Sequence, residues 1–489
     1  MIIALIVCFV VGYILITLEH PLKINKAAFA LLTGMLCWSL AAILPMPESI
    51  THVPAFQAFT ASLEAQGVLQ YLDPTEVFHK FLGKELSHHF ASIAEILFFL
   101  LGAMTIVELI DTHQGFKIIT NRVKTKNAVS LLWIMGLLTF FLSAALDNLT
   151  TTIVMVSLLK RLVHNEKQRI LFVGMIIIAA NAGGAWSPMG DVTTTMLWIG
   201  GQISAMNIIA TLFLPSLVCM AVPYAIASFF MKGTVERADY DYTEAEHQEE
   251  VRGSKVLFFA GIGALLFVPI FKLVTHLPPY MGMMIGLGFV WIVSELIHVD
   301  QTEEEKKNYT AVHALSKIDT SSILFFLGIL IAISSLESLH ILNNLALWLD
   351  NTIGNKDIIA SVIGVLSAVV DNVPLVAASM GMYPLATELS NTDAYQFALA
   401  NPNLVHDGAF MFNNVEYFLH DAKIWEFIAF TAGTGGSMLI IGSAAGVAAM
   451  GMEKIDFFWY FKKIAPLALA GYVAGILMYL FVYSFFAVH

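Results

Sequence analysis

Long apolar runs alternate with short polar stretches along the whole chain, and most runs have the length of one membrane crossing. A helix of about twenty apolar residues spans the hydrocarbon core of a bilayer. Two of the runs, 128–159 and 358–383, carry an Asp-Asn pair near the middle. This pattern predicts an all-α polytopic membrane protein, with the first run as a span rather than a removable signal. The other runs, each predicted to be one span, lie at 2–18, 27–44, 91–110, 168–200, 206–231, 256–274, 280–298, 319–340, 425–452 and 464–486.

The basic residues divide the loops into two groups. Lys and Arg accumulate in the cytoplasmic loops of membrane proteins. Basic residues flank the run 128–159 on both sides, so this run is predicted to be a re-entrant hairpin that enters and leaves on the cytoplasmic face. If 358–383 is also a hairpin, 20 of the 25 Lys and Arg residues lie on one side. The expected topology has ten spans and two hairpins in the inner (plasma) membrane, with both termini outside.

The two hairpins carry related sequences, which indicates an internal repeat. "SAALDNLTTT" begins at Ser143 and "SAVVDNVPLV" begins at Ser367, so the Asp-Asn pairs are 224 residues apart. The topology places the second hairpin on the opposite face, and such inverted-topology repeats are a common plan of secondary transporters. The predicted organisation is a first repeat at 1–231 with a broken helix at 168–200, a cytoplasmic linker at 232–254, and a second repeat at 255–489 with a broken helix at 425–452.

A run interrupted by small residues follows each hairpin. The first interruption reads "NAGGAWSPMGDVTTT" from Asn181, and the second reads "TAGTGGSMLIIGSAAG" from Thr431. Gly and Pro weaken a helix interior, so each run is predicted to be a broken helix. A break frees backbone carbonyls at membrane depth, and hard cations prefer oxygen ligands. The predicted cation and proton site comprises Asp147, Asn148, Thr151, Asn181, Asp191, Thr193, Thr194, Asp371, Asn372 and Ser437, with Na⁺ at Asp147, Asn148, Asp371 and Asn372.

Simpler structural roles exist for the same residues. An Asp that starts the second arm of a hairpin can serve as an N-cap. Ser and Thr hydroxyls also hold membrane helices together, which explains the three threonines from Thr150 equally well. An acid inside the membrane is costly, however, and is a functional hypothesis by default. Its repetition at related positions, Asp147 and Asp371, therefore favours a functional site.

Composition and charge exclude several classes of protein. Hydrophobic residues make up 58% of the chain and charged residues only 13%, against about 25% charged residues in soluble domains. The net charge of −12 argues against nucleic acid as a partner. The three cysteines show neither metal-ligand spacing nor a disulfide framework. No nucleotide-binding motif is present, so an ion gradient is expected to drive transport.

The order of "LDNLTTT", "NAGGAWSPMGD", "VDNVP" and "TAGTGGS" resembles the NhaD-type sodium/proton antiporters of the ion transporter superfamily, over most of the chain. Related dicarboxylate carriers have Ser-Asn-Thr at the hairpin tips. This chain has Asp in place of that Ser in both halves, which suits a cation. The second tip lacks the threonines of the first, so the two half-sites are expected to be unequal. The resemblance also implies a homodimer in which a transport bundle moves, elevator-like, against a fixed scaffold.

Together these features predict a secondary transporter, not an enzyme, that exchanges cytoplasmic Na⁺ or Li⁺ for external protons. It is expected to need no cofactor, and its partners are these ions, the lipid bilayer and a second copy of the chain. The proton and the cation compete for buried Asp residues, and Asp147 and Asp371 would titrate as a coupled pair if they approach each other.

Three alternatives remain open from the sequence. The nearest is an anion carrier of the same architecture, for a dicarboxylate or arsenite, although the hairpins and breaks contain no Arg or Lys at membrane depth. A cation channel is the second alternative. An intramembrane aspartyl protease is the third, but Asp191 lacks a Gly-x-Gly-Asp pattern and no span contains Tyr-Asp.

Overall fold

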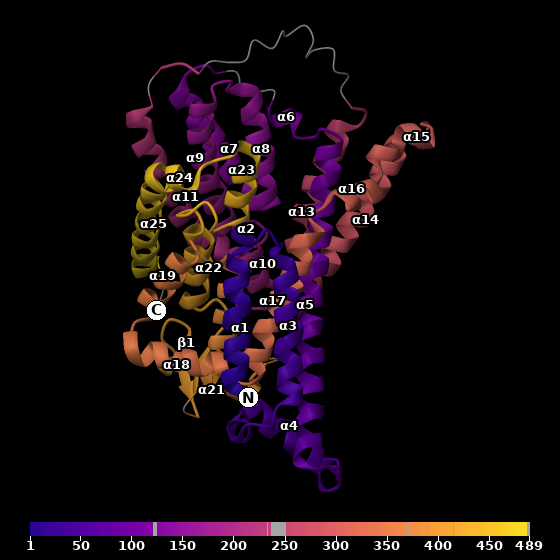
Figure 1. Cartoon of the computed structure of the whole chain (residues 1–489), viewed down its shortest axis with the longest axis vertical. Helices are drawn as coiled ribbons and strands as arrows, with labels where there is room; N and C mark the ends of the chain where they lie inside the picture. The colour runs from indigo at the N-terminus through magenta and orange to yellow at the C-terminus, as the bar shows by residue number, and fades with distance from the viewer. Residues whose placement is uncertain are drawn as a thin grey trace.

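The first half of the chain folds into mostly long apolar helices, of which α5 extends over much of the length of the molecule (Figure 1). The computed structural model describes residues 1–120, 125–231, 233–235, 251–369, 371–388, 390–413 and 415–486. Most of the predicted linker at 232–254 therefore lies outside the described residues. The main helices of this half are α1 (Ile2–Thr17), α3 (Lys26–Ile43), α5 (Pro74–Thr112), α7 (Ala128–Leu146), α8 (Asn148–Leu162), α9 (Glu166–Ala185), α10 (Val192–Ile199) and α11 (Ala205–Phe230).

The second half repeats this order of long and interrupted helices. Within the described residues, nine helices of the whole chain are long and apolar enough to cross a membrane, which confirms the all-α polytopic membrane class. The predicted run 2–18 forms a shorter helix of 16 residues. The main helices of this half are α13 (Ser254–Thr275), α14 (Pro279–Ile297), α17 (Thr320–Ser338), α18 (Ile341–Ile353), α19 (Lys356–Leu366), α20 (Asn372–Met382), α22 (Lys423–Gly435), α23 (Ala444–Glu453) and α25 (Ala465–Phe486).

Short elements connect these helices. They are α2 (Glu19–Leu22), η1 (Glu48–His52), α4 (Pro54–Ala65), η2 (Leu69–Tyr71), α6 (Lys117–Thr120), α15 (Glu303–Lys306), η3 (Lys307–Tyr309), α16 (Ala311–Lys317), α21 (Thr392–Ala400), η4 (Pro402–Leu404) and α24 (Phe457–Lys463). Figure 1 places α4, α18 and α21 at one end of the molecule and α6, α8 and α15 at the other.

Helix α5 begins well before the predicted span 91–110. It starts after a capping box, in which Asp73 accepts from the Glu76 amide and Glu76 accepts from the Asp73 amide. The turns of α5 before residue 91 contain polar residues, so a search for apolar runs does not detect them. Their apolar face is held by α4, where the ring of Phe56 lies 5.1 Å from the ring of Phe81.

The segment 384–424, which lies between two of the predicted apolar runs, contains ordered structure. Strands β1 (Ala409–Phe412) and β2 (Val415–Phe418) form an antiparallel hairpin with Ala409 opposite Phe418. Two residues of α21, Ala394 and Ala398, pack with Phe410 in a small separate core. This segment is therefore a folded cap over one end of the helices.

The helices pack in pairs that recur in the two halves. Helix α3 packs against α17, and α14 packs against α5. Both hairpin arms α7 and α8 contact α9, just as α19 and α20 contact α22. The second pieces of the broken helices cross over, since α23 packs against α8 and α10 packs against α20. The two interrupted helices α9 and α22 also contact each other at the centre.

Glycine permits the closest of these contacts. A Cβ atom built on Gly183 of α9 would lie 2.3 Å from the carbonyl oxygen of Phe140 in α7. A Cβ atom on Gly435 of α22 would lie 1.9 Å from the carbonyl oxygen of Gly364 in α19. Both obstacles are backbone atoms that cannot rotate away, so each glycine lets an interrupted helix touch its hairpin.

Gly435→Ala is expected to destabilise the folded protein by about 3 kcal/mol, the upper part of the range for overpacking. The matched control is Gly451→Ala in α23, where nothing lies within 4 Å of an added Cβ atom. Because Ala is a better helix former than Gly, this control should be neutral or slightly stabilising. Unfolding temperatures of both purified variants in detergent measure the difference. Equal unfolding temperatures for the two variants would contradict the close approach of α22 to α19.

Candidate functional site

Four helices start where the chain interrupts a hairpin or a broken helix, and the N-cap of each is a polar residue. The N-caps of α8, α10, α20 and α23 are Asp147, Asp191, Asp371 and Ser443. A helix N-terminus carries partial positive charge, which stabilises a carboxylate there. The N-cap role considered from the sequence for the hairpin acids is therefore confirmed for Asp147 and Asp371, and Asp191 has the same role in α10. It does not account for the side-chain contacts that these N-caps make with other elements.

Several buried polar side chains form one group, here called the polar cluster: Asn148, Asn181, Asp191, Asn372, Ser437 and Ser443. Asp191 lies at its centre and is 2% exposed. The amide nitrogen of Asn148 donates to Asp191 Oδ2 at 2.9 Å. The amide nitrogen of Asn372 donates to Asp191 Oδ1 at 3.3 Å and to Oδ2 at 3.1 Å. Thus the Asn of each Asp-Asn pair, although 224 residues apart in the chain, binds the same carboxylate.

Asn181 extends this network into the second broken helix. Its Oδ1 atom accepts a hydrogen bond from Asn148 at 3.1 Å. Its Nδ2 atom donates to the hydroxyl of Ser437 at 2.9 Å and to that of Ser443 at 3.0 Å. All these side chains are buried. The breaks in α9–α10 and α22–α23 are therefore joined through one asparagine.

Asp147 has a strained backbone and borders a small cavity. Its φ of 95° and ψ of 159° lie in a region that is essentially reserved for glycine and costs of order 1–3 kcal/mol. Its two carboxylate oxygens accept from the Thr150 amide at 2.7 Å and from the Thr150 hydroxyl at 2.9 Å. The cavity of about 60 Å³ is also bordered by Asn148, Ser322 and Phe326. This volume accommodates water or a small hydrated ion.

Asp371 differs from Asp147 because it has a cationic partner. The ammonium of Lys26, the first residue of α3, lies 2.8 Å from Asp371 Oδ2. The other carboxylate oxygen accepts from the Val373 amide at 3.3 Å. The coupled titration of Asp147 and Asp371 stays a prediction. The asparagine that follows each acid, Asn148 or Asn372, contacts the same carboxylate, that of Asp191.

The three predicted threonines occupy different positions. Thr194 donates its hydroxyl to the backbone carbonyl of Asp191 at 2.9 Å. The hydroxyls of Thr193, which follows Asp191 closely, and of Thr151, one turn after Asn148, are buried. Neither has a hydrogen-bond partner among the described residues. Buried polar atoms are usually satisfied, so these two oxygens are available to a ligand.

The acids do not form a cluster suited to a tightly held metal. Within the described residues, no three His, Cys, Asp or Glu side chains are close enough together to bind a metal ion. The centre is instead one carboxylate surrounded by amides and hydroxyls, with two further carboxylates beside it. Oxygen ligands of this kind suit a hard cation.

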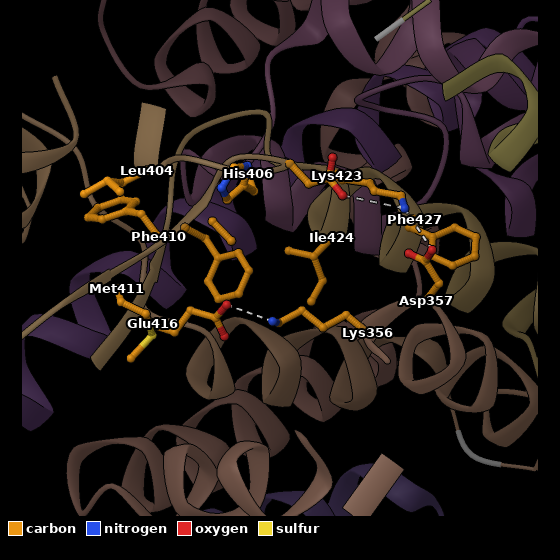
Figure 2. A pocket seen from close by; sticks show the side chains of 13 residues that line it. Lys356, Asp357, Leu404, His406, Phe410, Met411, Glu416, Lys423, Ile424 and Phe427 are labelled. Atoms are coloured by element: carbon orange, nitrogen blue, oxygen red, sulfur yellow. Dashed lines mark hydrogen bonds and ion pairs between the residues drawn. The ribbon is translucent and has the colours of Figure 1, made fainter. Parts of the chain in front are cut away.

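A larger hollow lies at the folded cap, away from this cluster. It has a volume of about 290 Å³ between the start of α19, the β-hairpin and the start of α22. Figure 2 shows its ion pairs: Lys356 with Glu416 and Lys423 with Asp357, each 2.8 Å long, and Lys423 with Asp407 at 3.9 Å. None of the polar-cluster residues named above borders this hollow. Each of its carboxylates is already paired with a lysine, so we do not place the transport site there.

Sequence reasoning missed two residues of the site. Ser443 follows Asp191 by 252 residues, the same offset that separates Gly183 from Gly435, so the repeat could have identified it. Lys26 had no such signal, because it belongs to a short basic loop that is 345 residues from Asp371 in the chain.

Comparisons with known proteins show which proteins this chain resembles. Residues 13–401 match a family model described as "Citrate transporter". The chain is 46% identical to "Sodium/proton antiporter 1" of Arabidopsis thaliana over 482 residues, which cover 99% of this chain and 73% of that protein. It is 44% identical to "Sodium/proton antiporter 2" of the same organism, with 98% and 99% covered. It is 28% identical to "Na(+)/H(+) antiporter NhaD" of Alkalimonas amylolytica, with 97% and 89% covered.

Proposed function

We propose, from the premise that this chain belongs to the family of NhaD-type sodium/proton antiporters, that it exchanges cytoplasmic Na⁺ for external protons. Members of this family are transporters, not enzymes. One observation carries the proposal: the asparagines of both Asp-Asn pairs donate to the buried carboxylate of Asp191. A single acid held by two separate helices, α8 and α20, can link ion binding to a change in their relative position.

The proposed mechanism is competition for this acid. Asp191 in its ionised form accepts the amide hydrogens of Asn148 and Asn372. Rotation of each amide by half a turn would present its carbonyl oxygen to a cation instead. The unpaired hydroxyls of Thr151 and Thr193 would supply further oxygens. A proton on the carboxylate removes the charge that attracts the cation, so one species displaces the other and the two flows are coupled.

The charge of the site favours a cation over an anion. The cluster has the carboxylate of Asp191 at its centre, and the carboxylates of Asp147 and Asp371 lie near it. The ammonium of Lys26 is paired with Asp371. An anion carrier would need unpaired positive charge at this depth. The same charges favour Li⁺ as a second substrate, because it is also a small hard cation.

The paired helix contacts support an inverted-topology repeat with two re-entrant hairpins. Equivalent residues make equivalent bonds: the Ser143 hydroxyl donates to the Ala180 carbonyl, and the Ser367 hydroxyl donates to the Ala432 carbonyl. The partners are offset by 224 and 252 residues, the same offsets that relate the hairpins and the glycine pairs. The inner-membrane location, the external termini, the elevator-like motion and the homodimer remain predictions.

Opposite entry of the hairpins predicts opposite labelling of their ends. Single cysteines replace Thr125, before α7, and Thr352, before α19, in a protein whose free cysteines Cys8, Cys37 and Cys219 are removed. A membrane-impermeant maleimide added to intact cells should label the Thr352→Cys protein, and the Thr125→Cys protein should react only after permeabilisation. Labelling of both from the same side would contradict the inverted repeat.

Reconstitution tests the proposed exchange directly. Purified protein in liposomes with an imposed pH gradient is given Na⁺, Li⁺, K⁺ or succinate in turn. Collapse of the gradient on addition of Na⁺ or Li⁺, and not of succinate, is the expected result. Collapse with succinate alone would establish an anion carrier, and Na⁺ flux that ignores the proton gradient would establish a channel.

A further inference from the structure

The two Asp-Asn pairs are related by the repeat, yet their acids have opposite surroundings. Asp371 has an ammonium at 2.8 Å and a relaxed backbone, with φ of −48°. Asp147 has a strained backbone and borders a cavity. In the described part of the chain, no Lys or Arg side chain pairs with Asp147. The repeat alone would give the two acids equal roles. Their different surroundings indicate that their roles differ.

Lys26 is held in position by several groups. Its backbone amide donates to Glu19 of α2 at 3.1 Å, and its ammonium lies 4.3 Å from the centre of the Phe325 ring of α17. The ammonium and the Asp371 carboxylate are only 25% and 16% exposed, so solvent screens the pair incompletely. The lysine therefore reaches Asp371 from a fixed base rather than as a freely moving surface side chain.

The other titratable groups near this pair do not replace either partner. The charges of Glu19 and of Asp319, the N-cap of α17, act on Lys26. The charge of Asp371 acts on Tyr13 of α1 and on Asp191 of α10. Among these groups Lys26 is the one cation, and Asp371 is the acid that it contacts.

We infer that Lys26 is a built-in counter-ion that makes Asp371 a fixed charge, so that the exchangeable acids are Asp147 and Asp191. The ion pair ties the start of α20 to α3, and its neighbour Asn372 then holds Asp191. The ammonium of Lys26 occupies the position beside Asp371 that a transported cation could otherwise take. The cavity beside Asp147, in contrast, leaves room for an ion. This inference rests on the proposed exchange and deepens it by assigning unequal roles to the two hairpins.

The inference predicts a selective rescue. Asp371→Asn leaves the ammonium of Lys26 without the carboxylate that it contacts, and this partly buried unpaired charge should slow Na⁺/H⁺ exchange in liposomes by at least about tenfold. Adding Lys26→Gln removes that charge and should restore most of the rate. Asp147→Asn should also inactivate the protein, but Lys26→Gln should not rescue it. Lys23→Gln, which removes a nearby basic residue of α2's C-terminal end, should not rescue Asp371→Asn.

Rescue of Asp371→Asn by Lys26→Gln, with no rescue of Asp147→Asn, supports the inference. A double variant as inactive as Asp371→Asn alone, with wild-type unfolding temperature, overturns it, because Asp371 would then be needed for more than balancing Lys26. Full activity of Asp371→Asn alone also overturns it.

A second readout does not depend on transport. Unfolding temperatures in detergent of wild type, Lys26→Gln, Asp371→Asn and the double variant form a double-mutant cycle for the ion pair. If the ammonium is the counter-ion of Asp371, the double variant should be more stable than the Asp371→Asn variant, because no unpaired ammonium is left in the partly buried site. Strictly additive effects of the two substitutions overturn the inference. If wild-type protein exchanges no ions, the proposed function fails, and the unfolding result still decides the role of Lys26.

Discussion

Replacing Asp191 with asparagine is expected to reduce sodium/proton exchange by about a hundredfold or more. Asparagine has nearly the same shape and can still cap α10, which begins with the Thr193 amide donating to Asp191 Oδ1 at 3.0 Å. The change therefore removes the charge while keeping the helix start. Asn148 and Asn372 would then face a neutral amide, which has no negative charge to attract Na⁺ and no proton to exchange. Exchange rates in liposomes measure the loss.

Asp456→Asn is the matched control for this change. Asp456 caps α24 by accepting from the Trp459 amide at 2.8 Å, and it contacts none of the polar-cluster residues described above. Its substitution should leave exchange within about twofold of wild type, since Asn caps a helix about as well as Asp. Both variants should have similar unfolding temperatures. Substantial exchange by the Asp191→Asn protein would show that the central acid is not the coupling group.

The apparent affinity for Na⁺ is expected to weaken as the pH falls. A protonated site must lose its proton before Na⁺ binds, so each pH unit below the controlling pKa should weaken binding up to about tenfold if one proton is displaced. Above that pKa the carboxylate is already ionised, and the affinity should become constant. Na⁺ titrations of exchange from neutral to alkaline pH measure this dependence. A constant affinity across the whole range would contradict competition between the two ions.

Local signals explain why much of the architecture could be predicted. The run 128–159 divides at Asp147, which caps the start of α8, and 168–200 divides after Ala185, where Pro188 and Gly190 follow within five residues and disfavour a continuous helix. The apolar runs likewise reflect burial in lipid. The start of α5 was predicted wrongly because its first turns are polar and are stabilised by contact with α4 instead of by burial in lipid.

The arrangement within the site depends on packing between distant segments, which no local pattern encodes. The sequence indicated Asp147 and Asp371 as the main acids, and the structure places Asp191 at the centre of their asparagines. The contact of Lys26 with Asp371 depends on the packing of α3 against α17 and of α17 against α20. A basic residue at a helix start is typical of a solvated loop, so its sequence position gave no indication of this role.

Proton release on Na⁺ binding tests the central claim most directly. Calorimetric titration of purified protein with NaCl, at a pH where the site is mostly protonated, is repeated in two buffers of different ionisation enthalpy. If Na⁺ and one proton compete for the Asp191 cluster, about one proton is released per Na⁺ bound. The observed heat will then differ between the buffers by the corresponding difference in their ionisation enthalpies. The same heat in both buffers, with Na⁺ bound, would contradict the account.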